Sequence, residues 1–195
     1  SLRNATITMI SALAIGLPTT WILARKTRLA QMLEPILMLP LGTSAVTLGL
    51  GFLLVFSRAP FNMRTSSLLI PLAHTLVAFP FVVRSLLPSW TIINPQLRKA
   101  AAMLGANPIQ VWREIDLPII GRAILVAGAF AFTISIGEFG ATILLSRPEF
   151  TTVPMAIYRY LSLPGALNYG QAMALSTLLM IFCIEAIRPN AISEF

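Results

Sequence analysis

Charged side chains are scarce in this chain of 195 residues: Asp, Glu, Lys and Arg make up 11% of it, against about a quarter of a typical soluble domain. Histidine and cysteine occur once each. A single histidine cannot form a two-histidine metal site, and Cys183 alone cannot form an internal disulfide framework. We therefore expect no metal site and no cofactor within the chain, and we interpret Cys183 as a small buried apolar residue.

Motifs of common enzymes and nucleotide-binding proteins are also missing. The sequence has no H-E-x-x-H pair, no G-x-S-x-G turn and no Gly-Lys-Ser/Thr phosphate loop. The net charge of +7 does not indicate nucleic-acid binding, because the basic residues form no cluster longer than the run Arg25, Lys26 and Arg28. We predict that the chain is not an enzyme, and that any ATP used with it is bound by another protein.

Long apolar runs dominate the chain instead: 56% of its residues are hydrophobic and its mean hydropathy is +0.81. A helix of about 20 apolar residues crosses a hydrocarbon core of about 30 Å. Pro71 and Pro80 are expected to kink the third such helix, and a short interfacial helix is expected at residues 153–161. We predict an all-α integral membrane protein with about five transmembrane helices, at residues 5–24, 36–56, 66–87, 123–145 and 169–187.

Residues 88–121 form a polar-capped segment between two apolar runs. The Asn-Pro pairs at 94–95 and 107–108 are helix start signals, since Asn caps a helix and proline fits its first position. Gly105 can end the first helix in a left-handed turn, and Pro118 is expected to limit the second helix. The sequence therefore predicts two short helices joined by a glycine turn, a helical hairpin at the membrane surface.

An ordered set of residues runs through this hairpin. Two alanines are followed after three residues by glycine, after nine more by isoleucine, and after one more by Leu-Pro. This spacing resembles the EAA loop of MetI-like permeases of binding-protein-dependent ABC importers, with lysine in place of the family's glutamate. The resemblance covers essentially the whole chain, and we interpret residues 1–195 as a single permease domain. It implies that the hairpin docks on an ATPase through Lys99, Ala100, Ala101, Gly105, Ile115, Leu117 and Pro118.

The same resemblance implies the function of a permease subunit. In such an importer a solute-binding protein delivers a small solute, two permease halves (identical or fused) enclose its path, and a separate ATP-binding cassette ATPase drives alternating access. A membrane scaffold that moves nothing is the rival interpretation, and a channel is disfavoured because no charged ring or carbonyl-filter motif occurs. The chain begins with Ser1 and has no signal-peptide cleavage site, so we expect a fragment or one half of a longer permease.

Two stretches bear on the substrate and its path. Residues 150–158 resemble a loop of thiamine and iron(III) permeases, and residues 137–142 resemble both oxyanion and thiamine permeases. We expect thiamine or iron(III) as the solute, with molybdate or sulfate as the alternative. Glu138 and His74 are candidate residues of the translocation path, because ionisable groups inside a membrane face protein or water. Each also has a structural interpretation as a hydrogen-bonding group, and for His74 that interpretation is favoured.

Basic residues indicate the orientation in a bacterial or archaeal cytoplasmic membrane, with lipid around the helices. With the hairpin in the cytoplasm, more basic residues lie on the cytoplasmic side than outside, which agrees with the positive-inside rule. The N-terminus is then outside. The cytoplasmic set is Arg25, Lys26, Arg28, Arg84, Arg98, Lys99, Arg113, Arg122 and Arg188, and the outer set is Arg3, Arg58, Arg64, Arg147 and Arg159.

Overall fold

The computed structural model describes residues 1–25, 27–57, 66–147 and 151–191. Every regular element in these ranges is helical and none is a strand, so the predicted all-α fold is confirmed. A bent helix pair adds a fifth candidate to four unbroken membrane-spanning candidates in the described ranges, which agrees with the predicted number of spans. The four are α1 (Leu2–Ala24), α4 (Leu69–Ile92), the continuous helix Pro108–Gly137 and α10 (Ala166–Ala191).

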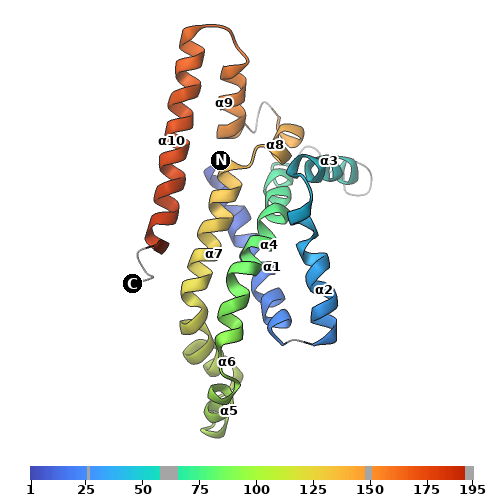
Figure 1. Cartoon of the computed structure of the whole chain (residues 1–195), viewed down its shortest axis with the longest axis vertical. Helices are drawn as coiled ribbons and strands as arrows, with labels where there is room; N and C mark the ends of the chain where they lie inside the picture. Colours follow the sequence, from blue (N-terminus) through green and yellow to red (C-terminus); the bar gives the residue numbers. More distant parts are fainter. Residues whose placement is uncertain (26, 58–65, 148–150, 192–195) are drawn as a thin grey trace.

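The second predicted span, at residues 36–56, is not one straight helix. It consists of the end of α2 (Arg28–Met38), the 3-10 turn η1 (Leu39–Gly42) and α3 (Ala45–Phe56). The two halves meet at an angle of 103°. As a result, α3 lies across one end of the bundle (Figure 1).

Local sequence explains this bend. Pro40 lies in the first turn of the 3-10 segment. The Ser44 hydroxyl then accepts a hydrogen bond from the Val46 amide at 3.3 Å, which makes Ser44 the N-cap of a new helix. The apolar run is therefore long enough for a span but contains the start signal of a second helix.

α4 is the central helix of the bundle, since 67% of its apolar window is buried and both α1 and α7 (Leu117–Gly137) pack along it. Pro80 and Pro88 lie inside α4, which continues to Ile92. Pro71 is only the third residue of the helix, where the backbone N–H has no helical acceptor in any case. The predicted interior kink at Pro71 is therefore wrong.

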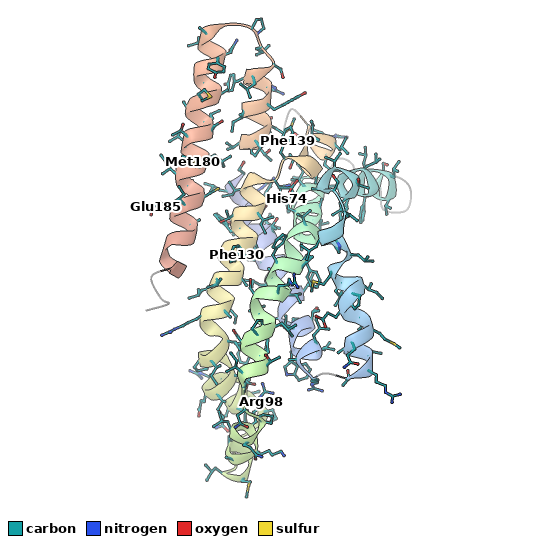
Figure 2. The ribbon with its side chains drawn as sticks, viewed as in Figure 1. His74, Arg98, Phe130, Phe139, Met180 and Glu185 are labelled. Carbon is teal, nitrogen blue, oxygen red and sulfur yellow. The ribbon has the colours of Figure 1, made fainter. Side chains whose placement is uncertain are left out.

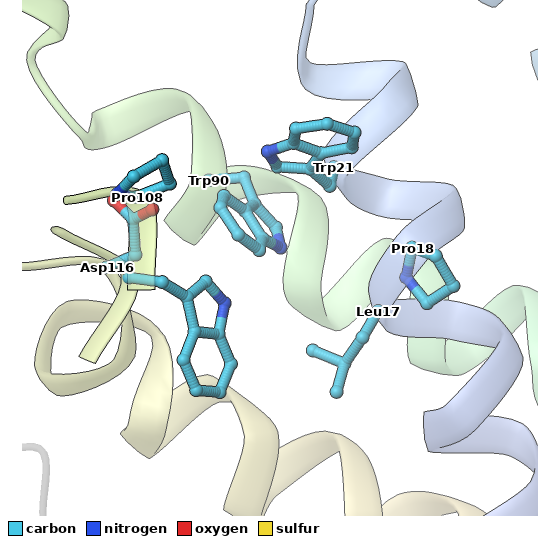
Figure 3. Close-up of a pocket in the computed structure, with 7 residues that line it drawn as sticks. Leu17, Pro18, Trp21, Trp90, Pro108 and Asp116 are labelled. Carbon is cyan, nitrogen blue, oxygen red and sulfur yellow. The ribbon is translucent and has the colours of Figure 1, made fainter. Parts of the chain in front are cut away.

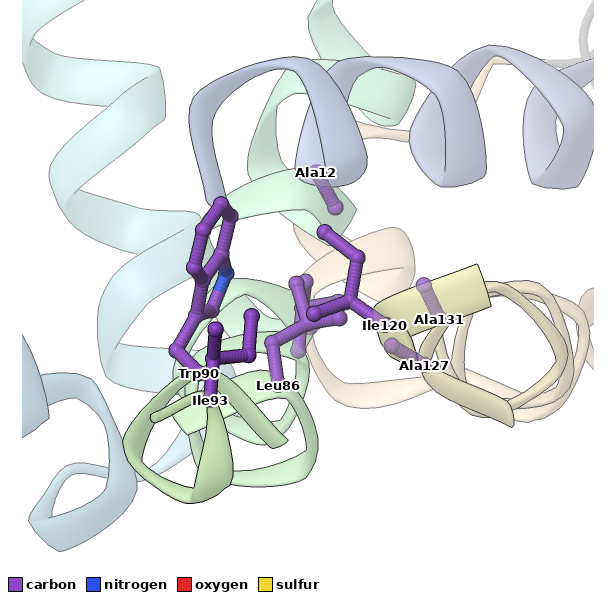
Figure 4. Close-up of a cluster of buried hydrophobic side chains, with 9 residues drawn as sticks. Ala12, Leu86, Trp90, Ile93, Ile120, Ala127 and Ala131 are labelled. Atoms are coloured by element: carbon purple, nitrogen blue, oxygen red, sulfur yellow. The ribbon is translucent and has the colours of Figure 1, made fainter. Parts of the chain in front are cut away.

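Small side chains allow close contact among these three helices. Among the described residues, the largest buried cluster joins Leu86 and Trp90 of α4 to Ile120 of α7 and to alanines from α1, α4 and α7 (Figure 4). On α1, a Cβ at Gly16 would lie 2.6 Å from Cγ1 of Val82. The packing therefore depends on the absence of a side chain at Gly16.

The predicted hairpin is present at the end of the bundle opposite α3 (Figure 1), where it consists of α5 (Pro95–Met103) and α6 (Pro108–Val111). Its second helix does not end at Pro118, which corrects the prediction. A π-helical turn, η3 (Trp112–Asp116), joins α6 directly to α7. Pro118 is the second residue of α7, directly after the change of hydrogen-bond register, where its missing N–H is tolerated.

The fourth predicted span, at residues 123–145, is interrupted at Glu138, between Gly137 and Gly140. α7 ends at Gly137, and α8 (Gly140–Leu145) follows after two residues. α9 (Val153–Leu161) has the predicted limits of the interfacial helix and packs with α10. Only 6% of the apolar window of α10 is buried, so this helix leaves most of its surface for lipid or another protein.

The candidate coupling hairpin and a buried histidine network

The ends of α5 are fixed by the residues that the sequence indicated. Asn94 Oδ1 accepts a hydrogen bond from the Gln96 amide at 2.9 Å. At the other end Gly105 has φ +85°, and the Ala106 amide donates to the Ala101 carbonyl at 3.0 Å. This is the Schellman arrangement, which satisfies carbonyls of the last helical turn. The helix start at Asn94 and the left-handed turn at Gly105 are both confirmed.

The second helix of the hairpin begins with a reciprocal cap. Asn107 Oδ1 accepts from the Gln110 amide at 2.9 Å, and the Gln110 side chain accepts from the Asn107 amide at 2.8 Å. Beyond the cap, the Leu117 amide donates to the Trp112 carbonyl, which closes the π-helical turn. Through this turn α6 and α7 form one continuous helix from Pro108 to Gly137.

One ion pair ties the two halves of the hairpin region together. Arg98 Nε on α5 lies 2.8 Å from Asp116 Oδ1 at the base of α7. The Asp116 side chain is 8% exposed and that of Arg98 is 36% exposed. The two residues are 18 positions apart, and nothing in the local sequence indicated the pair. It fixes the direction of α5 relative to the helix that enters the membrane.

The residues of the predicted docking set lie on an accessible surface of the hairpin. Lys99, Ala100, Gly105 and Pro118 are exposed, and Ala101, Ile115 and Leu117 are half-buried. No residue of α5 is buried. Large apolar side chains stand beside this set without cover from the described chain: Met103 and Leu104 are each 89% exposed, and Ile109 is 76% exposed.

His74 lies in the interior and is completely buried (Figure 2). Its Nδ1 is 2.8 Å from Ser135 Oγ on α7, and its Nε2 is 2.8 Å from Thr142 Oγ1 on α8. The Thr142 hydroxyl donates to the Glu138 carbonyl at 2.9 Å. Because a hydroxyl carries one hydrogen, Nε2 is the donor to Thr142.

The network extends to α1 through Thr8. The Ser135 and Thr8 hydroxyl oxygens are 3.1 Å apart, and the Thr8 hydroxyl also lies 3.2 Å from the Pro71 carbonyl. The sequence did not predict that Thr8, Ser135 and Thr142 form a network with His74, because hydroxyl residues are common in membrane helices and their partners lie far away along the chain. His74 thus joins α4 to both sides of the α7–α8 break.

Glu138 lies at that break and is half-buried. Its Oε1 accepts a hydrogen bond from the Ala141 amide at 3.0 Å, so the carboxylate satisfies a backbone donor in the first turn of α8. Both candidate path residues are therefore brought to the same region, where Thr142 connects them. In the described ranges, no group of three His, Cys, Asp or Glu side chains could hold a metal ion.

No protein-family model matches the chain. Several permeases are similar to it in sequence. ModB of Mycobacterium bovis, a molybdenum transport system permease protein, is 32% identical over 93% of this chain and 72% of its own length. PhnV of Salmonella paratyphi A, assigned by name to a 2-aminoethylphosphonate transport system, is 30% identical over 80% of this chain and 60% of its own length. The sulfate transport system permease protein CysT of Salmonella typhimurium is 28% identical over 90% of this chain and 69% of its own length.

The chain belongs to the MetI-like permeases of ABC importers. Together with its apolar helices, this family places the permease in the membrane as a multi-pass protein. The relatives are transport proteins and not enzymes. None of these three is named for thiamine or iron, so that expectation finds no support, and the molybdate or sulfate alternative agrees better with them.

Proposed function

We propose that this permease passes a small oxyanion, molybdate or sulfate, from a solute-binding protein across the cytoplasmic membrane by alternating access. A second permease half completes the path, and a separate ATPase supplies the energy. The relatives named for molybdenum and sulfate transport support this substrate class. In this proposal the hairpin is cytoplasmic and the N-terminus lies outside, which agrees with the distribution of basic residues.

The observation that supports an ATPase contact is the uncovered apolar surface of the hairpin. Met103, Leu104 and Ile109 project from a segment whose backbone is capped at three helix ends. A rigid segment that presents large apolar side chains has the composition expected of a protein interface. The small residues Ala100 and Gly105 beside them allow close approach by a partner. Lys99 adds a positive charge where the family has a negative one.

The continuous helix Pro108–Gly137 provides the mechanical link in this proposal. A displacement of the hairpin is transmitted along α7 to the break at Glu138, because no flexible turn lies between them. The Arg98–Asp116 pair carries α5 with the same movement. Ile115, Leu117 and Pro118 lie where this helix enters the membrane and anchor it there. Rigid-body rocking of packed helices is the usual form of such coupling.

A pair of substitutions with matched exposure tests the docking surface. Ile109 on the hairpin and Leu167 at the start of α10 are each 76% exposed, so neither Ile109→Asp nor Leu167→Asp removes core packing. We expect Ile109→Asp to reduce co-purification of the ATPase and ATP-dependent uptake into vesicles. Leu167→Asp is expected to keep the ATPase bound. Equal retention of ATPase by both variants would reject the hairpin as the contact.

The substrate is tested on the cognate solute-binding protein and the assembled transporter. We expect molybdate or sulfate to raise the thermal unfolding midpoint of the binding protein, because a ligand that binds only the folded state stabilises it. Thiamine and ferric iron are expected to have no effect. Uptake of the same anion should require ATP. A shift with thiamine or iron alone would reject the oxyanion, and absence of ATP-dependent uptake would favour a scaffold.

A further inference from the structure

A pocket of about 310 Å³ lies where the hairpin-side ends of α1, α4 and the Pro108–Gly137 helix meet (Figure 3). It is distinct from the exposed apolar surface of the hairpin and from the histidine network. Its walls are mainly aromatic, since three tryptophans line it together with two prolines, a leucine and a single acidic residue. The lining residues are Leu17, Pro18, Trp21, Trp90, Pro108, Trp112 and Asp116.

Two buried nitrogen donors at or near the pocket have no hydrogen-bond acceptor among the described residues. Trp90 is 6% exposed, and its Nε1 is buried with no hydrogen-bond partner among the described residues. Figure 3 shows this nitrogen on the side of the indole ring that faces Leu17 and Pro18, across the pocket. Arg98 Nη2, next to Asp116, is likewise buried without a partner in the described ranges. Buried N–H groups normally have an acceptor, so the pocket is suited to a ligand that supplies acceptors.

The charges around the pocket favour an anion. The Asp116 carboxylate is neutralised by its 2.8 Å contact with Arg98. On the opposite wall, the Arg25 guanidinium carbon lies 3.6 Å from the centre of the Trp21 ring, which leaves one positive charge in excess. Three aromatic rings can also enclose an ammonium group. Here, however, Arg25 and Arg98 already lie over rings of the wall and would repel a second cation.

The position of the pocket indicates the source of the anion. Trp21, Trp90 and Trp112 lie at the hairpin-side ends of membrane-spanning helices, and tryptophan is enriched at the headgroup level of bilayers. Basic pockets between transmembrane helices bind anionic lipid headgroups. A free anion shares the acceptor chemistry, but it would leave the apolar wall of Leu17 and Pro18 without a partner.

We propose that this pocket binds the headgroup of an anionic phospholipid, with the phosphate beside Arg25 and an oxygen of the headgroup or ester accepting from Trp90 Nε1. The proposal depends on the membrane location of the chain and not on the transported solute or on ATPase docking. A lipid in this place would fix the ends of α1, α4 and α7 relative to one another at the base of the hairpin.

Native mass spectrometry of the complete transporter tests the proposal after incorporation into vesicles of phosphatidylcholine with phosphatidylglycerol. We expect the wild-type permease to retain phosphatidylglycerol in preference to phosphatidylcholine. Trp90→Phe keeps an aromatic ring at this position and removes the N–H, and should lower retention about five- to tenfold, the change expected for one hydrogen bond. Trp112→Phe removes the N–H of a pocket-lining tryptophan that is not among the buried unpartnered donors, and it should lower retention less than Trp90→Phe.

A second pair of variants keeps the test independent of core folding. Arg25 and Arg84 are both exposed, so Arg25→Gln and Arg84→Gln each remove one charge without disturbing the buried core. Arg25→Gln should lower the retention of phosphatidylglycerol, and Arg84→Gln should not. Equal retention of both lipids by the wild type, or unchanged retention in Trp90→Phe and Arg25→Gln, overturns the proposal. Displacement of the lipid by inorganic phosphate would also overturn it, in favour of a free anion.

Discussion

The Nε2 atom of His74 lies 2.8 Å from Thr142 Oγ1, so the second turn of α4 is bonded to the helix that follows the α7–α8 break. The Nδ1 atom of the same ring lies 2.8 Å from Ser135 Oγ, on the helix that precedes the break. One imidazole therefore holds both sides of the interruption at Glu138. We propose that His74 fixes the relative direction of α7 and α8, and that it does not contact the solute in this conformation, since the ring is fully buried.

Removal of the ring is expected to destabilise the bundle. His74→Ala takes away both hydrogen bonds and leaves a cavity, so we expect a loss of about 1–3 kcal/mol in the free energy of unfolding. The thermal unfolding midpoint of the purified transporter in detergent measures this loss. Thr6→Val is the control, because Thr6 is exposed and bonds only a carbonyl of its own helix. Equal midpoints for the two variants would contradict a stabilising network.

Substitutions of Glu138 separate a helix-capping role of its side chain from a role of its charge in the translocation path. The acceptor oxygen of Glu138 bonds the Ala141 amide, and an amide oxygen can do the same. Glu138→Gln is therefore expected to keep stability and uptake near wild type. Glu138→Ala should cost about 0.5–2 kcal/mol, the usual loss for a helix-capping side chain. Uptake and unfolding midpoints are measured together; a Glu138→Gln variant that folds normally but transports no better than Glu138→Ala would indicate a charged path residue instead.

The parts of the fold that could be predicted depend on local signals. Asn94, Asn107 and Gly105 act within one helical turn, so the hairpin followed from the sequence with its caps and its left-handed turn. The apolar runs likewise revealed the membrane helices. Local signals also misled: Pro118 is a reliable end signal in an isolated helix, yet here a π-helical turn accommodates it and the helix continues.

The remaining features depend on contacts between distant residues. His74 is 61 positions from Ser135 and 68 from Thr142, and a single sequence carries no signal that pairs them. The bend of 103° in the second span has local causes instead, at Pro40 and at the Ser44 cap, but these signals are weak within a long apolar run. The identity of the solute is equally absent from local patterns, and it was the relatives that favoured an oxyanion.

Close packing of α3 on α8 predicts that alanine has different effects at two glycines of α3. A Cβ at Gly49 would lie 2.8 Å from the Ala141 Cα and 2.9 Å from its carbonyl oxygen, which are backbone atoms and cannot rotate away. A Cβ at Gly51 would meet nothing within 4 Å. We expect Gly49→Ala to destabilise the permease by about 1–3 kcal/mol. Gly51→Ala should be neutral or stabilise it by up to about 1 kcal/mol, since alanine favours the helix.

Thermal unfolding of the two glycine variants in the same detergent provides the measurement. Because both residues lie on α3 and the same methyl group is added, the difference between them isolates the contact with α8. The variants should also differ in uptake, if the position of α8 matters for transport. Similar midpoints would show that α3 does not pack on α8 as the structure describes.

The Arg98–Asp116 pair is suited to a double-mutant cycle. Arg98→Ala leaves the Asp116 carboxylate, 8% exposed, without its partner, whereas Arg98 itself is 36% exposed. We expect a loss of about 2 kcal/mol, below the about 3–5 kcal/mol of a fully buried pair, because water reaches the guanidinium. Asp116→Ala in the Arg98→Ala background removes the unpaired charge and should recover part of the loss.

Stimulated ATPase activity is a second measurement, which separates the effect of the ion pair on stability from its effect on coupling between the hairpin and α7. If the pair carries α5 with α7, Arg98→Ala should lower the ATPase activity stimulated by the solute-binding protein more than it lowers ATPase binding. The hairpin keeps its caps in this variant, so its docking surface persists while its direction relative to α7 is released. Purely additive effects of the two substitutions on unfolding, together with normal stimulation of the ATPase, would contradict this prediction. The ion pair would then neither stabilise the hairpin nor transmit its movement, and the continuous helix through the π-helical turn would be sufficient for both.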